Sequence, residues 1–177
     1  QLNEDGAEYF VNAGEINQKG IESSVDVKLL PHKAKGFFKS LNFQTAFTFN
    51  HYRFGNYMVK GNDFSENKVT AVPHHVWSNS LSIELPYTFK LNILHNYTSS
   101  MPLKDANTVF AKAFNLVQIK GTWTWNISPI IQLQLFAVVD NLLNEKYSLG
   151  NDINAFGNRY FNPAAVRNYY GGVKIEF

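Results

Sequence analysis

The chain has 177 residues, a length that suits one domain of ordinary size. Its net charge of +2 is too small and too scattered for a nucleic-acid-binding surface, and the lack of cysteine excludes disulfide bonds and thiol chemistry. Aromatic residues make up 15%, yet the mean hydropathy is −0.24, a combination that is typical of many half-buried strands. The sequence contains no run close to the ~18 consecutive apolar residues of a membrane helix.

The first ten residues, QLNEDGAEYF, include neither an initiator methionine nor an apolar signal segment. We therefore expect either that a signal was removed or that the chain is a piece of a longer protein. The first predicted element is a short strand near Glu8–Ala13.

From there to the C-terminus, apolar and polar residues alternate with a period of two, which places them on opposite faces of β-strands. Phe43 and Phe47, for example, alternate with Gln44 and Thr48. The sequence predicts an all-β fold, an antiparallel up-and-down meander of about eight strands, without a helix of useful length. After the first strand, the predicted strands are Lys19–Leu30, Leu41–Tyr52, Trp77–Leu85, Lys90–Thr98, Asn115–Trp125, Ile130–Val139 and Asn168–Phe177.

The connections between these strands alternate in length. PHKAKG, PYTF and NISP are short turns with Pro or Gly. The links Arg53–Val76, Ser100–Ala113 and Asn141–Val166 are long. Because alternate connections of a meander share an end, all long loops fall at one end and all short turns at the other. This sorting is typical of an outer-membrane barrel and has no reason in a soluble sandwich.

The aromatic residues favour the same interpretation. Trp123 and Trp125 lie near the short-turn end, and Trp77 and Tyr97 lie near the long-loop end, as in the two aromatic girdles of a membrane barrel. Large aromatics that fill a core are the alternative, but the positions between the girdles are mostly Leu, Ile, Val and Ala. The polar face suits a wet lumen or one filled by another domain. Polarity alone does not decide, because a soluble barrel could turn that face outward.

Catalytic or metal-binding sets are not evident in the sequence. His74 and His75 are adjacent, and neighbours on an extended backbone point to opposite faces, so only a bend would let both bind one metal. We interpret them as surface residues. Asp140, Glu145 and Asp152 do not pair with a histidine or serine at a suggestive spacing. We therefore expect no catalytic residues, no metal site and no cofactor.

One loop, NDINAFGNRYFNPAAV, carries candidate ligand-binding residues. Arg159 offers fork-shaped donors that suit the carboxylate or phosphate of an anionic ligand. Tyr160, Asn158 and Tyr147 are candidates beside it. The alternative is that Arg159 pairs with a carboxylate of a neighbouring loop.

Four segments resemble the TonB-dependent outer-membrane receptors. VVDNLLNEKY (Val138–Tyr147) resembles the end of their penultimate strand, and NPAAVRNYYGGVKIEF (Asn162–Phe177) resembles their last strand, including the terminal Phe. NQKGIESSVDV (Asn17–Val27) and VPHHVWSNSLSIEL (Val72–Leu85) are similar to the starts of earlier strands. One departure is Val166, where the family often has glycine before the arginine of the last strand.

The resemblance implies that residues 1–177 are the C-terminal portion of a transmembrane β-barrel of about 22 strands, with the plug and the earlier strands outside this sequence. It implies a location in the outer membrane of a Gram-negative bacterium. The implied function is active uptake of a scarce nutrient, most often a ferric siderophore or similar iron chelate, without catalysis. The implied partners are the TonB complex, the plug domain of the same full-length chain, outer-membrane lipid and the barrel assembly machinery.

The last strand is also implied to carry the signal for assembly, in Tyr169, Val173, Ile175 and Phe177. We expect Phe177 to face the lipid boundary at the short-turn end, near the two tryptophans. The pair Gly171 and Gly172 precedes no helix, so it is no phosphate-binding loop and instead allows close approach of neighbouring strands or the plug.

Two other functions remain open. One is a small autonomous eight-stranded outer-membrane protein, an anchor or a hydrolase; the hydrolase needs a Ser/His/Asp set or an acidic dyad at the loop rim. The other is a soluble lipocalin-like carrier, in which the apolar face lines an interior ligand site.

Overall fold

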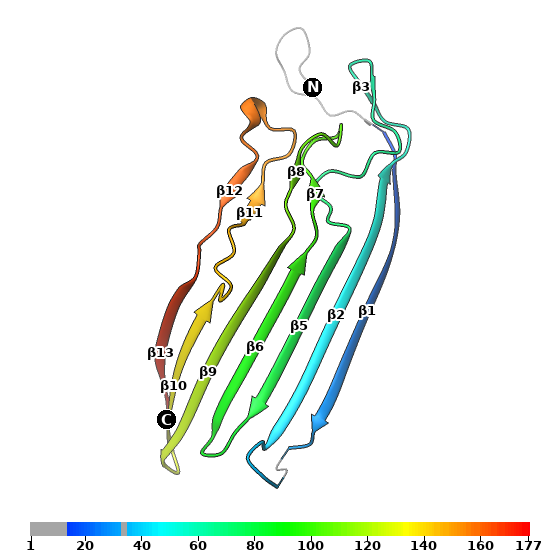
Figure 1. Cartoon of the computed structure of the whole chain (residues 1–177). Helices are drawn as coiled ribbons and strands as arrows, with labels where there is room; N and C mark the ends of the chain where they lie inside the picture. Colours follow the sequence, from blue (N-terminus) through cyan, green and yellow to red (C-terminus); the bar gives the residue numbers. More distant parts are fainter. Residues whose placement is uncertain (1–13, 33–34) are drawn as a thin grey trace.

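A computed structural model describes residues 14–32 and 35–177, and its main feature is one sheet of seven antiparallel strands (Figure 1). Each strand pairs with the next long strand along the chain, so the predicted up-and-down meander is confirmed. The predicted strand near Glu8–Ala13 lies outside the described residues. In order across the sheet, the strands are β1 (Ile16–Leu30), β2 (Ser40–Phe54), β5 (His75–Glu84), β6 (Phe89–Thr98), β9 (Phe114–Ser128), β10 (Ile131–Asp140) and β13 (Asn168–Glu176).

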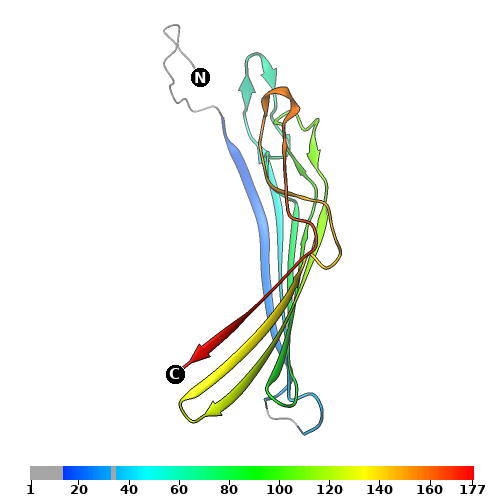
Figure 2. The same ribbon diagram turned by 90° about the vertical axis from the view of Figure 1, so that its left-hand side faces the viewer.

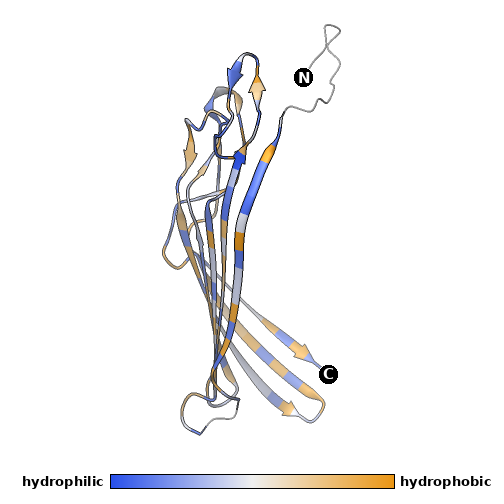
Figure 3. Ribbon diagram, turned by 90° about the vertical axis from the view of Figure 1, so that its right-hand side faces the viewer, coloured by the Kyte–Doolittle hydropathy of each residue, from blue (hydrophilic) through white to orange (hydrophobic). Residues whose placement is uncertain are grey.

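The strand register places the apolar residues on one face across the whole sheet. Because side chains alternate along a strand, residues paired directly across the sheet share a face. One row contains only apolar or aromatic side chains: Val27, Phe43, Leu81, Ile93, Ile119, Val139 and Tyr169. The adjacent row is mostly polar: Lys28, Asn42, Ser82, Asn92, Lys120, Val138 and Tyr170. We call these two sides the apolar face and the polar face, and Figure 3 shows hydrophilic and hydrophobic residues alternating along the strands that face the viewer.

The long loops lie together at one end of the sheet and the short turns at the other (Figures 1 and 2), as predicted. The long loops also contain three small hairpins that the sequence analysis did not predict. These are β3 (Met58–Val59) with β4 (Asn62–Asp63), β7 (Met101–Pro102) with β8 (Phe110–Ala111), and β11 (Ser148–Asn151) with β12 (Phe161–Pro163). The first hairpin turns at Lys60 and Gly61, whose φ values of 49° and 79° are those that a two-residue hairpin turn requires. Glycine favours a positive φ, so Gly61 is a sequence signal for this turn.

The sheet is a single curved layer in which β1 and β13 form the two edges (Figure 2). In the described residues the one helix is a 3-10 turn, η1 (Phe156–Asn158), and no helix there has the length and apolarity to cross a membrane. A one-layer sheet buries few side chains by itself. The tightly buried apolar cluster lies instead in the long loops, around Leu103.

Close packing between β10 and β13 explains one glycine of the last strand. A Cβ atom at Gly172 would lie 2.7 Å from the ring of Phe136, which is its direct cross-strand neighbour. The aromatic ring therefore covers the glycine, a pairing that fixes strand register. Lys120 places its Nζ 5.1 Å from the centre of the same ring. The expected close approach of a neighbouring strand is thus present.

Candidate functional site

The long loops pack around a small apolar cluster. Leu103, in the β7–β8 hairpin, is fully buried, and Tyr160, from the β10–β13 loop, is 2% exposed. Ala111 completes the buried cluster. Lys104 adds a cation–π contact, with its Nζ 5.6 Å from the centre of the Tyr160 ring. Two loops far apart in the sequence therefore share one interior.

A carboxylate joins the third long loop to these two. Asp105 accepts hydrogen bonds from the Tyr57 hydroxyl at 3.0 Å and from the Thr70 hydroxyl at 2.5 Å, both in the β2–β5 loop. It also accepts one from the side-chain amide of Asn154 at 3.0 Å. Burial, together with the hydrogen bond and the charge of Asp105, raises the pKa of Tyr57 above its ordinary value. The sequence analysis did not identify this carboxylate.

A cavity of about 330 Å³ lies between the β8–β9 segment and the β10–β13 loop. The rings of Tyr147 and Phe114 pack there at an interplanar angle of 35°, with ring centres 5.0 Å apart. The Asn151 Oδ1 atom is buried without a hydrogen-bond partner among the described residues. The charged lining residues are two lysines and one glutamate, so the cavity combines aromatic walls with a net positive charge. The lining includes Phe110, Lys112, Phe114, Glu145, Lys146, Tyr147, Asn151 and Phe161.

The four predicted ligand-binding residues are placed in different environments. Tyr147 lines the cavity, whereas Asn158 and Arg159 are exposed on the loop outside its lining. Arg159 forms no ion pair within residues 14–32 and 35–177. The Tyr160 ring is buried between the loops, and its hydroxyl donates to Asn158 at 3.4 Å.

The residues predicted for assembly and for the aromatic girdles share the apolar face. Val173 and Ile175 fall in the same cross-strand rows as Trp123 and Trp125, and Tyr169 lies further along β13. Phe177 is fully exposed, beside the turn at Pro129 and Ile130. The rings of Trp123 and Trp125 stack 6.1 Å apart, and Trp77 pairs with Tyr97 across β5 and β6.

His74 and His75 are closer together than strand alternation would allow. His74 precedes β5, and the two ring centres lie 4.5 Å apart beside Phe49. Neither Nδ1 atom has a hydrogen-bond partner in the described structure. Across the described ranges, no group of three or more His, Asp or Glu side chains is arranged to hold a metal ion.

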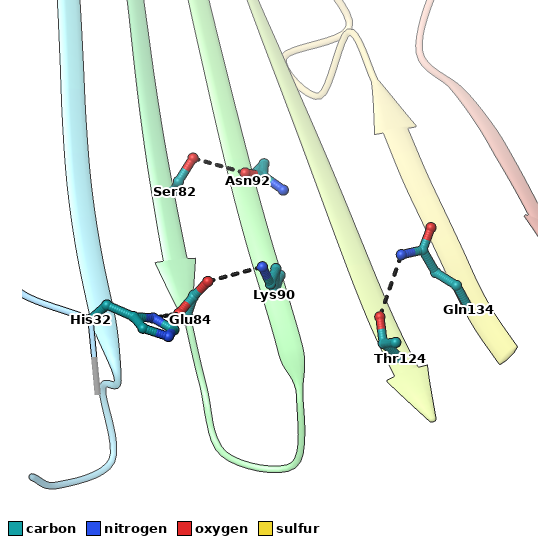
Figure 4. A network of polar contacts seen from close by, with 7 residues as sticks. All are labelled: His32, Ser82, Glu84, Lys90, Asn92, Thr124 and Gln134. Carbon is teal, nitrogen blue, oxygen red and sulfur yellow. Dashed lines mark hydrogen bonds and ion pairs between the residues drawn. The ribbon is translucent and has the colours of Figure 1, made fainter. Parts of the chain in front are cut away.

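The polar face carries a network near the short-turn end (Figure 4). Glu84 accepts a hydrogen bond at 2.6 Å from the His32 ring and pairs with the Lys90 ammonium at 2.9 Å. Ser82 donates to Asn92 at 2.9 Å between the same two strands, β5 and β6. Cross-strand polar contacts of this kind suit a lumen that holds water or another polar domain.

A set of hydrogen-bonded polar side chains crosses the apolar face, and the sequence analysis did not identify it. Trp77 donates to Thr45 at 2.7 Å, and Thr45 donates to Asn79 at 2.8 Å. The Asn79 amide donates to His95 Nδ1 at 3.0 Å, and His95 Nε2 lies 3.0 Å from Asn115 Oδ1. We call Thr45, Asn79, His95 and Asn115 the polar ladder. Its members satisfy one another, which lowers the penalty of placing them beside lipid.

Comparison with known proteins identifies a matching family and a matching fold. Residues 1–142 match the model of the family described as TonB dependent receptor-like, beta-barrel. The ferric preacinetobactin receptor BauA from Acinetobacter baumannii is similar with a TM-score of 0.73 and 17% identity, over 94% of this chain and 23% of that chain. A search of curated protein sequences found no match.

Two further solved structures are similar to the same degree. The siderophore receptor PiuA from Acinetobacter baumannii has a TM-score of 0.66 and 17% identity, over 93% of this chain and 22% of that chain. The ferric yersiniabactin uptake receptor FyuA from Yersinia pestis has a TM-score of 0.67 and 15% identity, over 93% of this chain and 24% of that chain. The chain thus spans less than a quarter of each of these structures, and the likeness concerns the fold.

Proposed function

Since the chain belongs to the TonB-dependent receptor-like β-barrel family, whose members are outer-membrane proteins of Gram-negative bacteria, we propose that it is the C-terminal portion of an active-transport receptor. The proposed cargo is a ferric siderophore or a similar iron chelate, and the energy source is the TonB complex. The observation that carries the proposal is the apolar row across all seven strands, from Val27 to Tyr169. A sheet with one lipid-compatible face and all long loops at one end is what a sector of such a barrel requires.

The long loops are the proposed place of ligand capture. The cavity beside Tyr147 offers aromatic walls with two lysines and one glutamate, Lys112, Lys146 and Glu145, and Arg159 adds an exposed guanidinium on the adjacent loop. These groups suit a ligand that is both flat and negatively charged. The ligand is bound and released without a bond being made or broken.

The two faces are proposed to meet different partners. The apolar face contacts outer-membrane lipid, and the polar face, with its Glu84–Lys90 pair, contacts the plug domain of the full-length chain. The exposed edge strand β13, with Val173 and Ile175 and the adjacent Phe177, is proposed to be recognised by the barrel assembly machinery through strand addition.

Equilibrium binding of a panel of ferric chelates to the full-length receptor tests the proposal. We expect one chelate to bind and Arg159→Ala to weaken it roughly tenfold, because a hydrogen bond to a charged group is lost. Arg167→Ala is the matched control, since among the described residues the hydrogen bond of Arg167 is made by its backbone amide, to Asn144. Mass spectrometry of the released chelate should show it unaltered. Failure of the unmutated receptor to bind any iron chelate, or turnover of the ligand, would contradict the proposal.

A further inference from the structure

The Asp105 carboxylate occupies a central position among the long loops. It lies between β7 and β8 and accepts three side-chain hydrogen bonds, all from other loops: Tyr57 and Thr70 from the β2–β5 loop, and Asn154 from the β10–β13 loop. These donors are 48, 35 and 49 residues away in the sequence. A single side chain therefore touches both neighbouring loops at once.

The backbone of Asp105 repeats the same connections. Its N–H donates to Asn154 Oδ1 at 3.0 Å, so Asp105 and Asn154 bond to each other in both directions. Its carbonyl accepts from the Asn67 side-chain amide at 2.8 Å. The side chain and the backbone of Asp105 therefore both contact each neighbouring loop.

Backbone amides also cross between the loops around Asp105. Ala71 N–H donates to the Pro102 carbonyl at 2.8 Å, and Asn154 N–H donates to the Leu103 carbonyl at 2.8 Å. The Lys68 N–H donates to Asn107 Oδ1 at 2.9 Å. These three amides report directly on whether the loops are joined.

The charge of Asp105 strengthens this arrangement. In the described part of the chain its carboxylate forms no ion pair, so the donors that stabilise its charge are neutral hydroxyl and amide groups. Hydrogen bonds to an ionised acceptor are roughly twice as strong as those between neutral groups. Thr70 is buried and Tyr57 is half-buried, which limits competition from water.

We propose that Asp105 is a positioning residue that fastens the three long loops into one unit before ligand arrives. The β10–β13 loop carries Arg159 and part of the cavity wall, so its attachment through Asn154 fixes the geometry of the ligand site. A site that is already ordered loses less conformational entropy when it binds. The part of this inference that concerns ligand rests on the proposed function, whereas the fastening of the loops does not.

Hydrogen exchange on the full-length receptor without ligand tests the fastening. In Asp105→Asn, the amides of Ala71, Asn154 and Lys68 should exchange roughly tenfold faster or more, together, because a charge-assisted network is lost. Asp152→Asn is the matched control: it removes one charge from the same end of the molecule, from a side chain with no described hydrogen bond. The proposal would be overturned if Asp105→Asn accelerated exchange only within the β7–β8 hairpin. It would also be overturned if Asp105→Asn and Asp152→Asn accelerated the three amides equally.

Ligand binding and a second variant complete the test. The chelate that the unmutated receptor binds should dissociate roughly tenfold faster or more from Asp105→Asn, with the unfolding midpoint of the barrel unchanged. If the loops separate but the affinity is unchanged, the positioning role is wrong. If Asp105→Asn fails to assemble, Tyr57→Phe removes one donor and should accelerate the Ala71 and Lys68 amides; normal exchange there would overturn the fastening. If the unmutated receptor binds no iron chelate, the proposed function fails while exchange still decides the fastening.

Discussion

The seven-stranded sheet and the long loops are held together in different ways. In the sheet, the contacts are backbone ladders between strands that follow one another in the chain, and apolar side chains such as Ile21 and Val173 remain 64% exposed. In the loops, Leu103 and Tyr160 are buried, and Asp105 joins segments more than thirty residues apart. The sheet exposes apolar surface that lipid covers, whereas the loops form an interior of their own, as a water-facing region must.

A charge placed on the apolar face should have the largest effect. Leu81→Arg lies in the fully apolar row, and an arginine at the lipid midplane costs about 2–4 kcal/mol in membrane barrels. Its neighbour Ser82 faces the polar side, so Ser82→Arg should cost much less. The measurement is the free energy of unfolding of the full-length receptor in lipid vesicles. Equal losses for the two variants would contradict the assignment of the faces.

The polar ladder sharpens the same comparison, because there the sheet joins several strands through side-chain hydrogen bonds on its apolar face. His95→Leu removes the acceptor for Asn79 and should cost about 1–3 kcal/mol, since a polar group beside lipid is left unpaired. Asn79→Leu/His95→Leu should cost less than the sum of the two single changes. The free energies of unfolding of the unmutated receptor, the two single variants and the double variant in vesicles measure the coupling. Strict additivity would show that Asn79 and His95 do not stabilise each other.

The pair on the polar face should matter much less to stability. Glu84→Gln keeps the shape and removes the charge that pairs with Lys90, whose side chain is 56% exposed. An exposed ion pair contributes about 0–1 kcal/mol and is screened by salt. The unfolding free energy should therefore change little, and the change should vanish in high salt. A loss that persists in high salt would mean that the pair is shielded from solvent.

The smallest expected effect is a shift in the titration of Tyr57. Burial is the largest cause of its raised pKa, and the hydrogen bond and the charge of Asp105 raise the pKa further. The stabilisation is complete below the ordinary tyrosine pKa and is lost as pH rises through the higher folded value. Asp105→Asn should lower this pKa toward, but not to, the ordinary value. The phenolate absorbance difference between each protein and its Tyr57→Phe variant measures it; an unchanged pKa would contradict the contact.

The sheet was predictable from the sequence and the loop site largely was not. Period-two patterns such as Phe43 to Phe47 specify both the strand and the face, and short turns make consecutive strands pair. The loop contacts depend on pairs such as Tyr57 and Asp105, which are 48 residues apart and carry no periodic signal. Tyr160 shows the same limit, because its burial depends on Leu103 from another loop. The glycine of the Lys60–Gly61 turn, where φ is positive, is a local sequence signal for one loop hairpin.

Iron accumulation by intact cells tests the central claim most directly. The experiment uses otherwise identical cells with and without TonB. In both, the full-length receptor is the only uptake route for the chelate that it binds. The account predicts accumulation of iron that requires both the receptor and TonB and that is reduced in cells carrying Arg159→Ala. Equal accumulation without TonB, or no receptor-dependent accumulation with any iron chelate, would contradict it.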